Sequence, residues 1–267
     1  MEIVFTVIIV LIIVDFLVFL FLITPNKKRV IPVAKAYAHR GLHDKQTPEN
    51  SLSAFKKASE NRFGVEFDVQ LTKDKQIVVF HDESLLRMTG MSAEIIDLTY
   101  NELCKYGLNN TDEKIPLLRE VLIALDGVPI LCEIKKQRSN TNIEICPYLV
   151  GELDEYQGDI CIESFSPFIL KWFKEHRPDF ARGQLSADFI KTKGELKGIS
   201  ALFMKNLLLN FFGRPDFIAY KFTDASIGLL FIKKFFHTPV LGWTARGEEE
   251  REICRQDFDG EIFEINS

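Results

Sequence analysis

The chain opens with a long apolar run. Residues 3–23 are apolar apart from Thr6 and Asp15. A helix rises 1.5 Å per residue, so this run would extend roughly 30 Å, about the thickness of the hydrocarbon core of a bilayer. We therefore expect residues 1–24 to form a transmembrane helix. A secretory signal peptide fits less well, because the run is too long, no basic segment precedes it and no small-x-small cleavage motif follows it.

Basic residues come directly after this run. Pro25 and Asn26 interrupt the helical pattern, and the sequence Lys-Lys-Arg follows at 27–29. The positive-inside rule then predicts that the remainder of the chain lies in the cytoplasm, with residues 25–33 as a tether. The five cysteines are odd in number and form no CxxC pair, which favours reduced thiols and agrees with that compartment.

Beyond the tether, strand-like and helix-like patterns alternate. Alternating strands and helices over about 240 residues favour a (β/α)8 TIM barrel spanning residues 34–267. The predicted strands are Ala34–His39, Val65–Leu71, Ile130–Lys135, Ile160–Ser164, Arg182–Ser186, Phe217–Lys221, Val240–Thr244 and Glu261–Ile265. The predicted helices are Glu49–Ser59, Leu117–Leu125, Ile143–Leu153, Pro167–His176, Ile199–Leu209, Ala225–Phe236 and Glu248–Gln256.

Three further observations concern this predicted fold. A doubly wound sheet is the alternative fold, but no G-x-G-x-x-G motif follows the first strand. The sequence stops just after the eighth strand, so we expect another segment, such as the tether, to cover that flank. Two helix starts have a hydroxyl residue before a proline, namely Thr47 before Pro48 and Ser166 before Pro167.

A ninth strand pattern, Gln76–His81, breaks the alternation. Only four residues separate it from Leu71, which is too short for a parallel crossover, so the two strands should form an antiparallel hairpin. Residues 83–116 then form an irregular insertion, and a loop of this length in a compact domain is usually functional.

Acidic residues occupy one face of two predicted neighbouring strands. Glu66 and Asp68 are two apart and so share a face, and Glu133 occupies the next barrel strand. Three carboxylates in an otherwise apolar barrel would repel one another unless a cation joins them. Oxygen ligands suit a hard divalent ion, Ca²⁺ or Mg²⁺. The sequence therefore predicts a site for one divalent cation at Glu66, Asp68 and Glu133.

Two histidines approach the same place. His39 follows the first strand, and the hairpin brings His81 back beside Glu66. Two imidazoles aimed at an acid cluster suggest an acid/base pair. Arg40, next to His39, offers a planar guanidinium fork for a phosphate.

The residues quoted so far belong to longer motifs. "AHRG", "PENSLSAF", "GVEFDVQLTKDKQIVVFHD", "LCEIK" and "GWTAR" occur in the order seen in glycerophosphodiester phosphodiesterases. The chain resembles that family over about residues 34–265. The resemblance implies a (β/α)8 barrel and metal-dependent phosphodiester hydrolysis.

The resemblance also implies roles for single residues. His39 and His81 match the acid/base histidines, Arg40 and Lys135 match basic residues near the phosphate, and Trp243 matches the aromatic at the glycerol end of the substrate. The metal ligands it implies are Glu66, Asp68 and Glu133. Two places depart from the family pattern, "SFSP" at 164–167 and "EIFEINS" at 261–267. We expect neither to touch the ion or the histidines, and the eighth loop and helix to contribute little.

These features imply hydrolysis of glycerophosphodiesters to sn-glycerol 3-phosphate and an alcohol. An anchored barrel could instead take membrane lysophospholipids, as a lysophospholipase D does, and the apolar stretch 201–217 would either line a groove for them or pack as a core helix. A non-catalytic scaffold fits poorly because the whole catalytic set is present. A glycosidase would need neither the arginine nor two histidines. The net charge of −5 gives no electrostatic footprint for nucleic acid.

Overall fold

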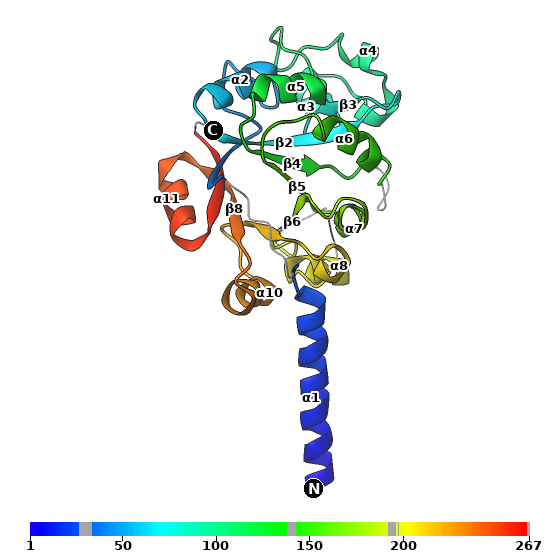
Figure 1. Cartoon of the computed structure of the whole chain (residues 1–267), viewed down its shortest axis with the longest axis vertical. Helices are drawn as coiled ribbons and strands as arrows, with labels where there is room; N and C mark the ends of the chain where they lie inside the picture. Colours follow the sequence, from blue (N-terminus) through cyan, green and yellow to red (C-terminus); the bar gives the residue numbers. More distant parts are fainter. Residues whose placement is uncertain (27–33, 138–142, 192–195, 197, 266–267) are drawn as a thin grey trace.

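A closed parallel barrel forms the centre of the structure (Figure 1). A computed structural model describes residues 1–26, 34–137, 143–191, 196 and 198–265. Strand β1 is hydrogen-bonded to both β2 and β9, which closes the sheet and confirms the predicted (β/α)8 barrel. The barrel strands in the described residues are β1 (Ala36–His39), β2 (Gly64–Leu71), β4 (Ile130–Ile134), β5 (Ile160–Ser164), β6 (Ala181–Ser186), β7 (Phe217–Lys221), β8 (Val240–Arg246) and β9 (Gly260–Glu264).

Helices cover the outside of the barrel close to where the sequence predicts them. One start is wrong: α2 begins at Leu52, because the Ser51 hydroxyl caps it by accepting from the Ala54 amide. Glu49 lies before the helix and binds arginines instead. The barrel helices are α2 (Leu52–Glu60), α5 (Leu118–Leu125), α6 (Ile145–Leu153), α7 (Pro167–His176), α8 (Ile199–Lys205), α9 (Asn210–Gly213), α10 (Ile227–Phe231), which continues as a π-helix (Ile232–Phe236), and α11 (Gly247–Asp257).

The hairpin after β2 forms as predicted, with a shorter second strand. β3 (Ile77–Val79) pairs antiparallel with β2. The insertion after it is more ordered than expected, with three short helical turns, α3 (Leu86–Thr89), a 3-10 turn (Ile95–Asp97) and α4 (Tyr100–Leu103). Its buried side chains form an apolar cluster of their own with β3, which explains why these turns hold together.

The barrel interior is apolar at the amino ends of the strands and acidic at the carboxyl ends. Leu131, Cys161 and Phe217 belong to the buried apolar cluster inside the barrel. Gly183 on β6 leaves room for the Phe217 ring, since a Cβ on Gly183 would lie 2.2 Å from it. Two residues nearer the carboxyl end than Leu131 and Cys161, Glu133 and Glu163 lie side by side on the adjacent strands β4 and β5.

The flank next to β9 is covered by α11 and by a phenylalanine from the α2–β2 connection. Phe263 points outward and meets Phe63 with ring centroids 5.1 Å apart, while Arg251 of α11 stacks over its other side. The tether was the expected cover, but residues 27–33 lie outside the described residues. Within the described residues, this flank is thus covered by side chains of neighbouring elements.

A long apolar helix, α1 (Glu2–Ile23), stands out from the barrel (Figure 1). It is long and apolar enough to cross a membrane, with a mean hydropathy of 3.3, a test that a signal sequence also passes. Its last residue, Ile23, is buried against the barrel. The Asn26 amide donates to the Pro215 carbonyl, so the start of the predicted tether is docked.

We predict that Gly183→Ala destabilises the protein. The added methyl group must displace the Phe217 ring inside a packed barrel, at a cost of about 1–3 kcal/mol in the free energy of unfolding. Gly151→Ala is the control, because Gly151 lies on the exposed face of α6 with no atom within 4 Å of an added Cβ. That change should instead stabilise the protein by up to about 1 kcal/mol. Denaturant unfolding of the full chain in detergent measures both; equal stabilities of the two variants would contradict the packing argument.

Candidate active site

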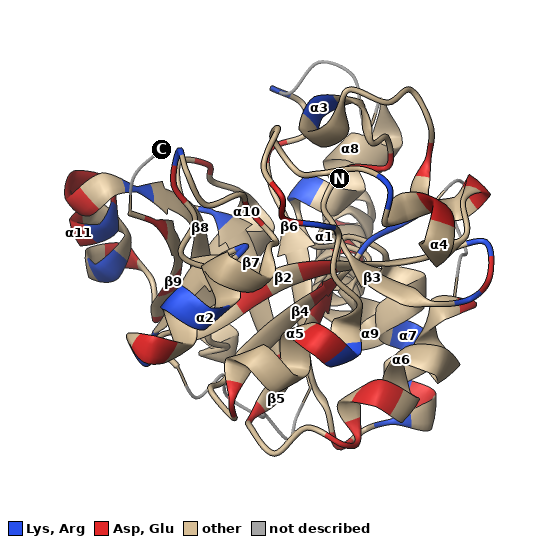
Figure 2. Ribbon diagram, turned by 90° about the horizontal axis from the view of Figure 1, so that it is seen from above, with Lys and Arg blue, Asp and Glu red and all other residues tan. Residues whose placement is uncertain are grey.

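Three carboxylates meet at the carboxyl ends of β2 and β4. Glu66, Asp68 and Glu133 are all buried, and each offers an oxygen within 4.8 Å of the others. The register explains the meeting, because Asp68 lies directly opposite Glu133 and strand alternation places Glu66 on the same inner face. Figure 2 shows acidic positions side by side on these two strands. The structure therefore brings the three predicted cation ligands together.

Burial and mutual repulsion make it unfavourable for all three of these carboxylates to be charged. Burial raises the pKa of Glu66 well above its usual value, and the charges of Asp68, Glu133 and Glu163 raise it further. Burial would also raise the pKa of Asp68, but Lys135 and Arg40 hold it well below its usual value. Three buried oxygens of this kind fit a hard divalent cation, whose charge would remove the repulsion.

Two basic side chains adjoin the cluster. The Lys135 ammonium lies 2.8 Å from Glu133 and 3.4 Å from Asp68, and these two carboxylates outweigh burial to raise the pKa of Lys135. The Arg40 guanidinium lies 3.4 Å from Asp68, and the Arg40 amide donates to Glu66. Both cations thus lie directly beside the carboxylate cluster.

His39 is oriented by a carboxylate on the last strand. Its Nδ1 lies 2.6 Å from Oε1 of Glu264, and its Nε2 lies 3.9 Å from Glu66. A carboxylate can only accept, so Nδ1–H donates to Glu264 and Nε2 remains free to exchange a proton toward the cluster. Burial lowers the pKa of His39 to about 4 despite the Glu264 carboxylate, so the imidazole is neutral at neutral pH.

This contact corrects one expectation. The end of the eighth barrel strand, "EIFEINS", does touch a catalytic candidate, through Glu264. Burial alone would raise the pKa of Glu264, but its hydrogen bond with His39 helps to lower it to about 2, so it stays charged. Strand alternation from Ile262, which lies inside the barrel, would have identified the inward-facing position.

His81 has the same arrangement on the opposite side. Its Nδ1 lies 2.6 Å from Oδ1 of Asp82, and Arg87 binds that carboxylate through Nε at 2.6 Å. Arg87 also binds Glu49, which in turn accepts from Arg40. A chain of ion pairs therefore links Arg40 to the carboxylate that binds His81.

The candidate site opens into a cavity of about 400 Å³ with two unlike walls. One wall is polar and includes both histidines, Arg40 and Lys135. The other is apolar, and its aromatic rings pack edge to face, Phe165 with Phe189 and with Trp243, at 5.8 Å between centroids in each pair. The apolar wall consists of Phe165, Leu185, Ala187, Phe189 and Trp243. Trp243, for which the resemblance implies a contact with the glycerol end of the substrate, lines this cavity.

Residues 201–217 do not line this cavity as one groove. They divide into α8 and α9, and Ala201 and Met204 of α8 are buried behind Ala187 and Phe189. The helix therefore supports the apolar wall from outside, which is close to the core-helix alternative.

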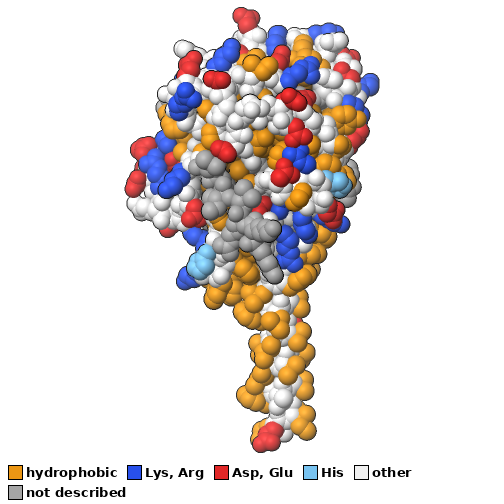
Figure 3. Space-filling model, in the orientation of Figure 1, with side chains coloured by type: hydrophobic (Ala, Val, Ile, Leu, Met, Phe, Trp, Pro, Cys, Tyr) orange, Lys and Arg blue, Asp and Glu red, His pale blue; other side chains and the backbone are white. Residues whose placement is uncertain are grey.

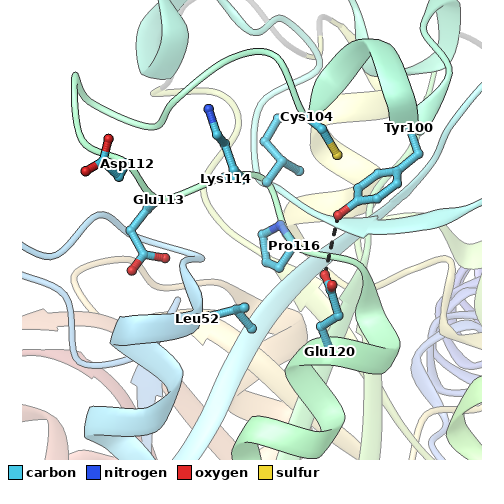
Figure 4. A pocket seen from close by; sticks show the side chains of 9 residues that line it. Leu52, Tyr100, Cys104, Asp112, Glu113, Lys114, Pro116 and Glu120 are labelled. Atoms are coloured by element: carbon cyan, nitrogen blue, oxygen red, sulfur yellow. Dashed lines mark hydrogen bonds between the residues drawn. The ribbon is translucent and has the colours of Figure 1, made fainter.

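Another hollow, of about 550 Å³, lies between α2, α5 and the insertion (Figure 4). Its acidic residue Glu120 accepts from the Tyr100 hydroxyl and caps the start of α5 through the Leu117 amide. These groups have structural partners and do not converge on a common point, so this hollow lacks the features of a catalytic site.

Sequence reasoning also missed two buried residues beside the cluster. Asn50, from "PENS", donates to Asp68 and so fixes its orientation. Glu163 on β5 is buried beside Glu133, and burial and the neighbouring carboxylates raise its pKa well above the usual value. Its position two residues after Cys161 on an inward-facing strand was the available signal.

The family of the chain follows from comparison with known proteins. The profile of the Glycerophosphoryl diester phosphodiesterase family matches residues 39–255. The chain belongs to this family. Its fold matches that of an Oleispira antarctica phosphodiesterase solved in complex with sn-glycerol-3-phosphate, with a TM-score of 0.69 and 23% identity over 86% of this chain and 92% of that one.

Similar proteins of known name support this family assignment. A glycerophosphodiester phosphodiesterase from Caldanaerobacter subterraneus is 34% identical over 161 residues, which is 55% of this chain and 65% of that protein. The human lysophospholipase D GDPD1 is 36% identical over 123 residues, or 41% of this chain and 39% of that protein. The matches thus span less than two thirds of these relatives.

We predict that Asp68→Asn weakens Ca²⁺ and Mg²⁺ binding at least about 100-fold, because even changes beyond the direct ligands commonly cost 10–100-fold. Titration calorimetry on the full chain, stripped with EDTA, measures the affinity. Asp82→Asn is the matched control, since Asp82 binds His81 and Arg87 rather than the cluster. Equal weakening by both changes would contradict the three-carboxylate site.

Proposed function

We propose that the chain hydrolyses glycerophosphodiesters to sn-glycerol 3-phosphate and a free alcohol. One observation carries the proposal: two imidazoles, each held by a carboxylate through Nδ1, face a cluster of three buried carboxylates across one cavity. The family assignment and the glycerol-phosphate product in the Oleispira neighbour support the same chemistry.

Glu66, Asp68 and Glu133 would hold the divalent cation, Ca²⁺ or Mg²⁺, which supplies charge neutralisation at the phosphate. Arg40 and Lys135 bind the remaining phosphoryl oxygens and stabilise negative charge as it grows in the transition state. Trp243 packs on the glycerol end of the substrate. The substrate is thereby held with its phosphorus between the two histidines.

The histidines move the protons. One accepts a proton through Nε2 from the attacking water or the substrate's own hydroxyl, and the other donates a proton to the leaving alcohol. Glu264 and Asp82 hold the two rings in the tautomer with Nδ1 protonated and stabilise each ring when it is charged.

A second candidate substrate is a lysophospholipid, cleaved by the same groups. The apolar wall of Phe165, Leu185, Ala187, Phe189 and Trp243 favours it, because such a wall suits an acyl chain. The human relative named lysophospholipase D supports it as well. Comparing rates on glycerophosphocholine and lysophosphatidylcholine separates the two candidates.

We also propose that residues 1–24 anchor the barrel domain, residues 34–267, in a lipid bilayer. The apolar α1 supports the span, and the basic residues at 27–29 favour a cytoplasmic barrel under the positive-inside rule. The five cysteines are free thiols and four of them are buried, which is compatible with the reducing environment of the cytoplasm.

We expect the full chain to release sn-glycerol 3-phosphate from glycerophosphocholine, and EDTA to abolish this release until Ca²⁺ or Mg²⁺ is restored. His39→Ala and His81→Ala should each lower kcat about 10²- to 10⁴-fold, the usual contribution of acid/base catalysis. An enzyme-coupled assay of sn-glycerol 3-phosphate measures both effects. Full hydrolysis of glycerophosphocholine in the presence of EDTA, or by His39→Ala, would contradict the proposal.

A nitrophenyl ester of glycerol phosphate tells the two histidines apart. Nitrophenolate leaves without a proton, so the variant lacking the acid should regain most of its rate on this substrate, while the variant lacking the base should not. Rescue of both variants, or of neither, would contradict separate acid and base roles.

Glu264→Gln should lower kcat about 10- to 100-fold, because the amide loses the charge that orients and stabilises the His39 ring. We expect KM and cation affinity to stay close to those of the unmodified chain, which is the internal control. Steady-state kinetics with calorimetry on the same preparation tests this. A matching loss of cation affinity would assign Glu264 to the metal cluster instead.

A further inference from the structure

The end of α1 is fixed to the barrel by specific contacts. Phe16 and Phe19 meet Phe231 of α10, with ring centroids 5.9 and 5.2 Å apart. The guanidinium of Arg214 donates to the carbonyls of Phe21 and Thr24, each at 2.8 Å. The Asn210 amide donates to the carbonyl of Ile23, the last residue of the helix. These contacts set the orientation of the barrel relative to the helix axis.

The same contacts determine how far along α1 the barrel begins. Phe16 precedes Ile23 by seven residues, so it lies about 10 Å back along the helix axis. Phe231 packs against both Phe16 and Phe19 and therefore lies alongside the last two turns of α1. A bilayer that α1 crosses must then meet α10 at its surface.

The part of the barrel at this level exposes large apolar side chains. Six such residues, defined here as the base surface, have exposed fractions between 45 and 72%. Figure 1 shows α8 and α10 at the end of the barrel from which α1 emerges, and in Figure 3 the apolar surface of α1 continues onto this end, with Lys and Arg beside it. The base surface consists of Ile190, Ile199, Leu202, Ile227, Leu230 and Phe235.

This surface is joined to the active cavity. Phe189 lines the apolar wall of the cavity, and the next residue, Ile190, is 58% exposed on the base surface. Ala201 and Met204 of α8 are buried behind that wall, while Leu202 between them faces outward. One layer of side chains thus separates the apolar wall from the outside.

We propose that the base surface inserts into the interfacial layer of the bilayer that α1 crosses, and so places the cavity where it receives single-chain phospholipids directly from the membrane. The proposal rests on the membrane anchoring and deepens the proposed function by naming its substrate class. An apolar surface of this kind, flanked by basic side chains such as Lys234 and Arg214, matches the apolar and anionic layers of a lipid surface.

The position of the surface is tested on the full chain in vesicles of phosphatidylcholine and phosphatidylglycerol. A polarity-sensitive fluorophore is attached to one introduced cysteine in a Cys104→Ser background, because the other four native thiols are buried. Phe235→Cys reports the base surface and Val10→Cys reports α1. Ile123→Cys is the matched control, since Ile123 is 80% exposed on α5, away from α1.

Brominated lipids should quench the fluorophore at positions 10 and 235 and leave position 123 unquenched. Quenching at 10 with none at 235 would overturn the base surface while the anchor stands. No quenching at 10 would overturn the anchor and this proposal together, whatever substrate the enzyme turns over.

Activity provides the second measurement. Leu230→Asp with Phe235→Asp should slow hydrolysis of vesicle-borne lysophosphatidylcholine about tenfold or more, because two apolar membrane contacts are lost. Hydrolysis of soluble glycerophosphocholine by the same variant should be unchanged, which also shows that it folds. Ile123→Asp is the control and should change neither rate. Unchanged hydrolysis of the lipid, or equal losses on both substrates, would overturn the proposal.

Discussion

The repulsion among buried carboxylates is the constraint on which the rest of the cavity depends. Glu66, Asp68 and Glu133 have been taken out of water at the carboxyl ends of two adjacent strands, with Glu163 beside them. Buried charges of one sign are stable only with opposite charge next to them. Arg40 and Lys135 provide part of it, and a divalent cation would provide the remainder. The same positive charge is what a phosphodiester requires, so the electrostatic need of the barrel agrees with the proposed substrate.

Much of this could be read from the sequence, because strand alternation is a local rule. Asp68 and Glu133 share the inner face of neighbouring strands as the spacing predicts, and the hairpin carries His81 back to them. The family resemblance depends on the same local motifs. The barrel itself was predicted from the alternation of strand-like and helix-like patterns along the chain, and the closed sheet confirms it.

What the sequence left out depends on contacts between distant segments. The bond between His39 and Glu264 joins residues 225 apart, and it forms only because β9 closes the barrel against β1. The docking of Asn26 and Arg214 at the end of α1 likewise joins segments about 190 residues apart. Neither contact leaves a periodic signal, because a single side chain makes each of them. The helix start at Leu52 has a local cause, because the Ser51 hydroxyl caps it, and the displaced Glu49 is bound by Arg40 and Arg87 from elsewhere in the fold.

The barrel divides its strands between two tasks. β1, β2 and β4 carry His39 and the three carboxylates, and Lys135 follows β4. Phe165 and Phe189 instead follow β5 and β6, Trp243 lies on β8, and these three belong to the apolar wall. The proposed anchor, α1, docks on α9 and α10, which precede and follow β7. If α1 crosses a bilayer as proposed, β2 and β4, which carry the carboxylates, lie at the far end of the barrel from the hydrocarbon, where an unpaired charge would be costly (Figure 1). Under the proposed function, a substrate with a phosphate head and an apolar tail would have one favourable orientation in the cavity, with the phosphate beside Arg40 and Lys135 and the tail along the apolar wall.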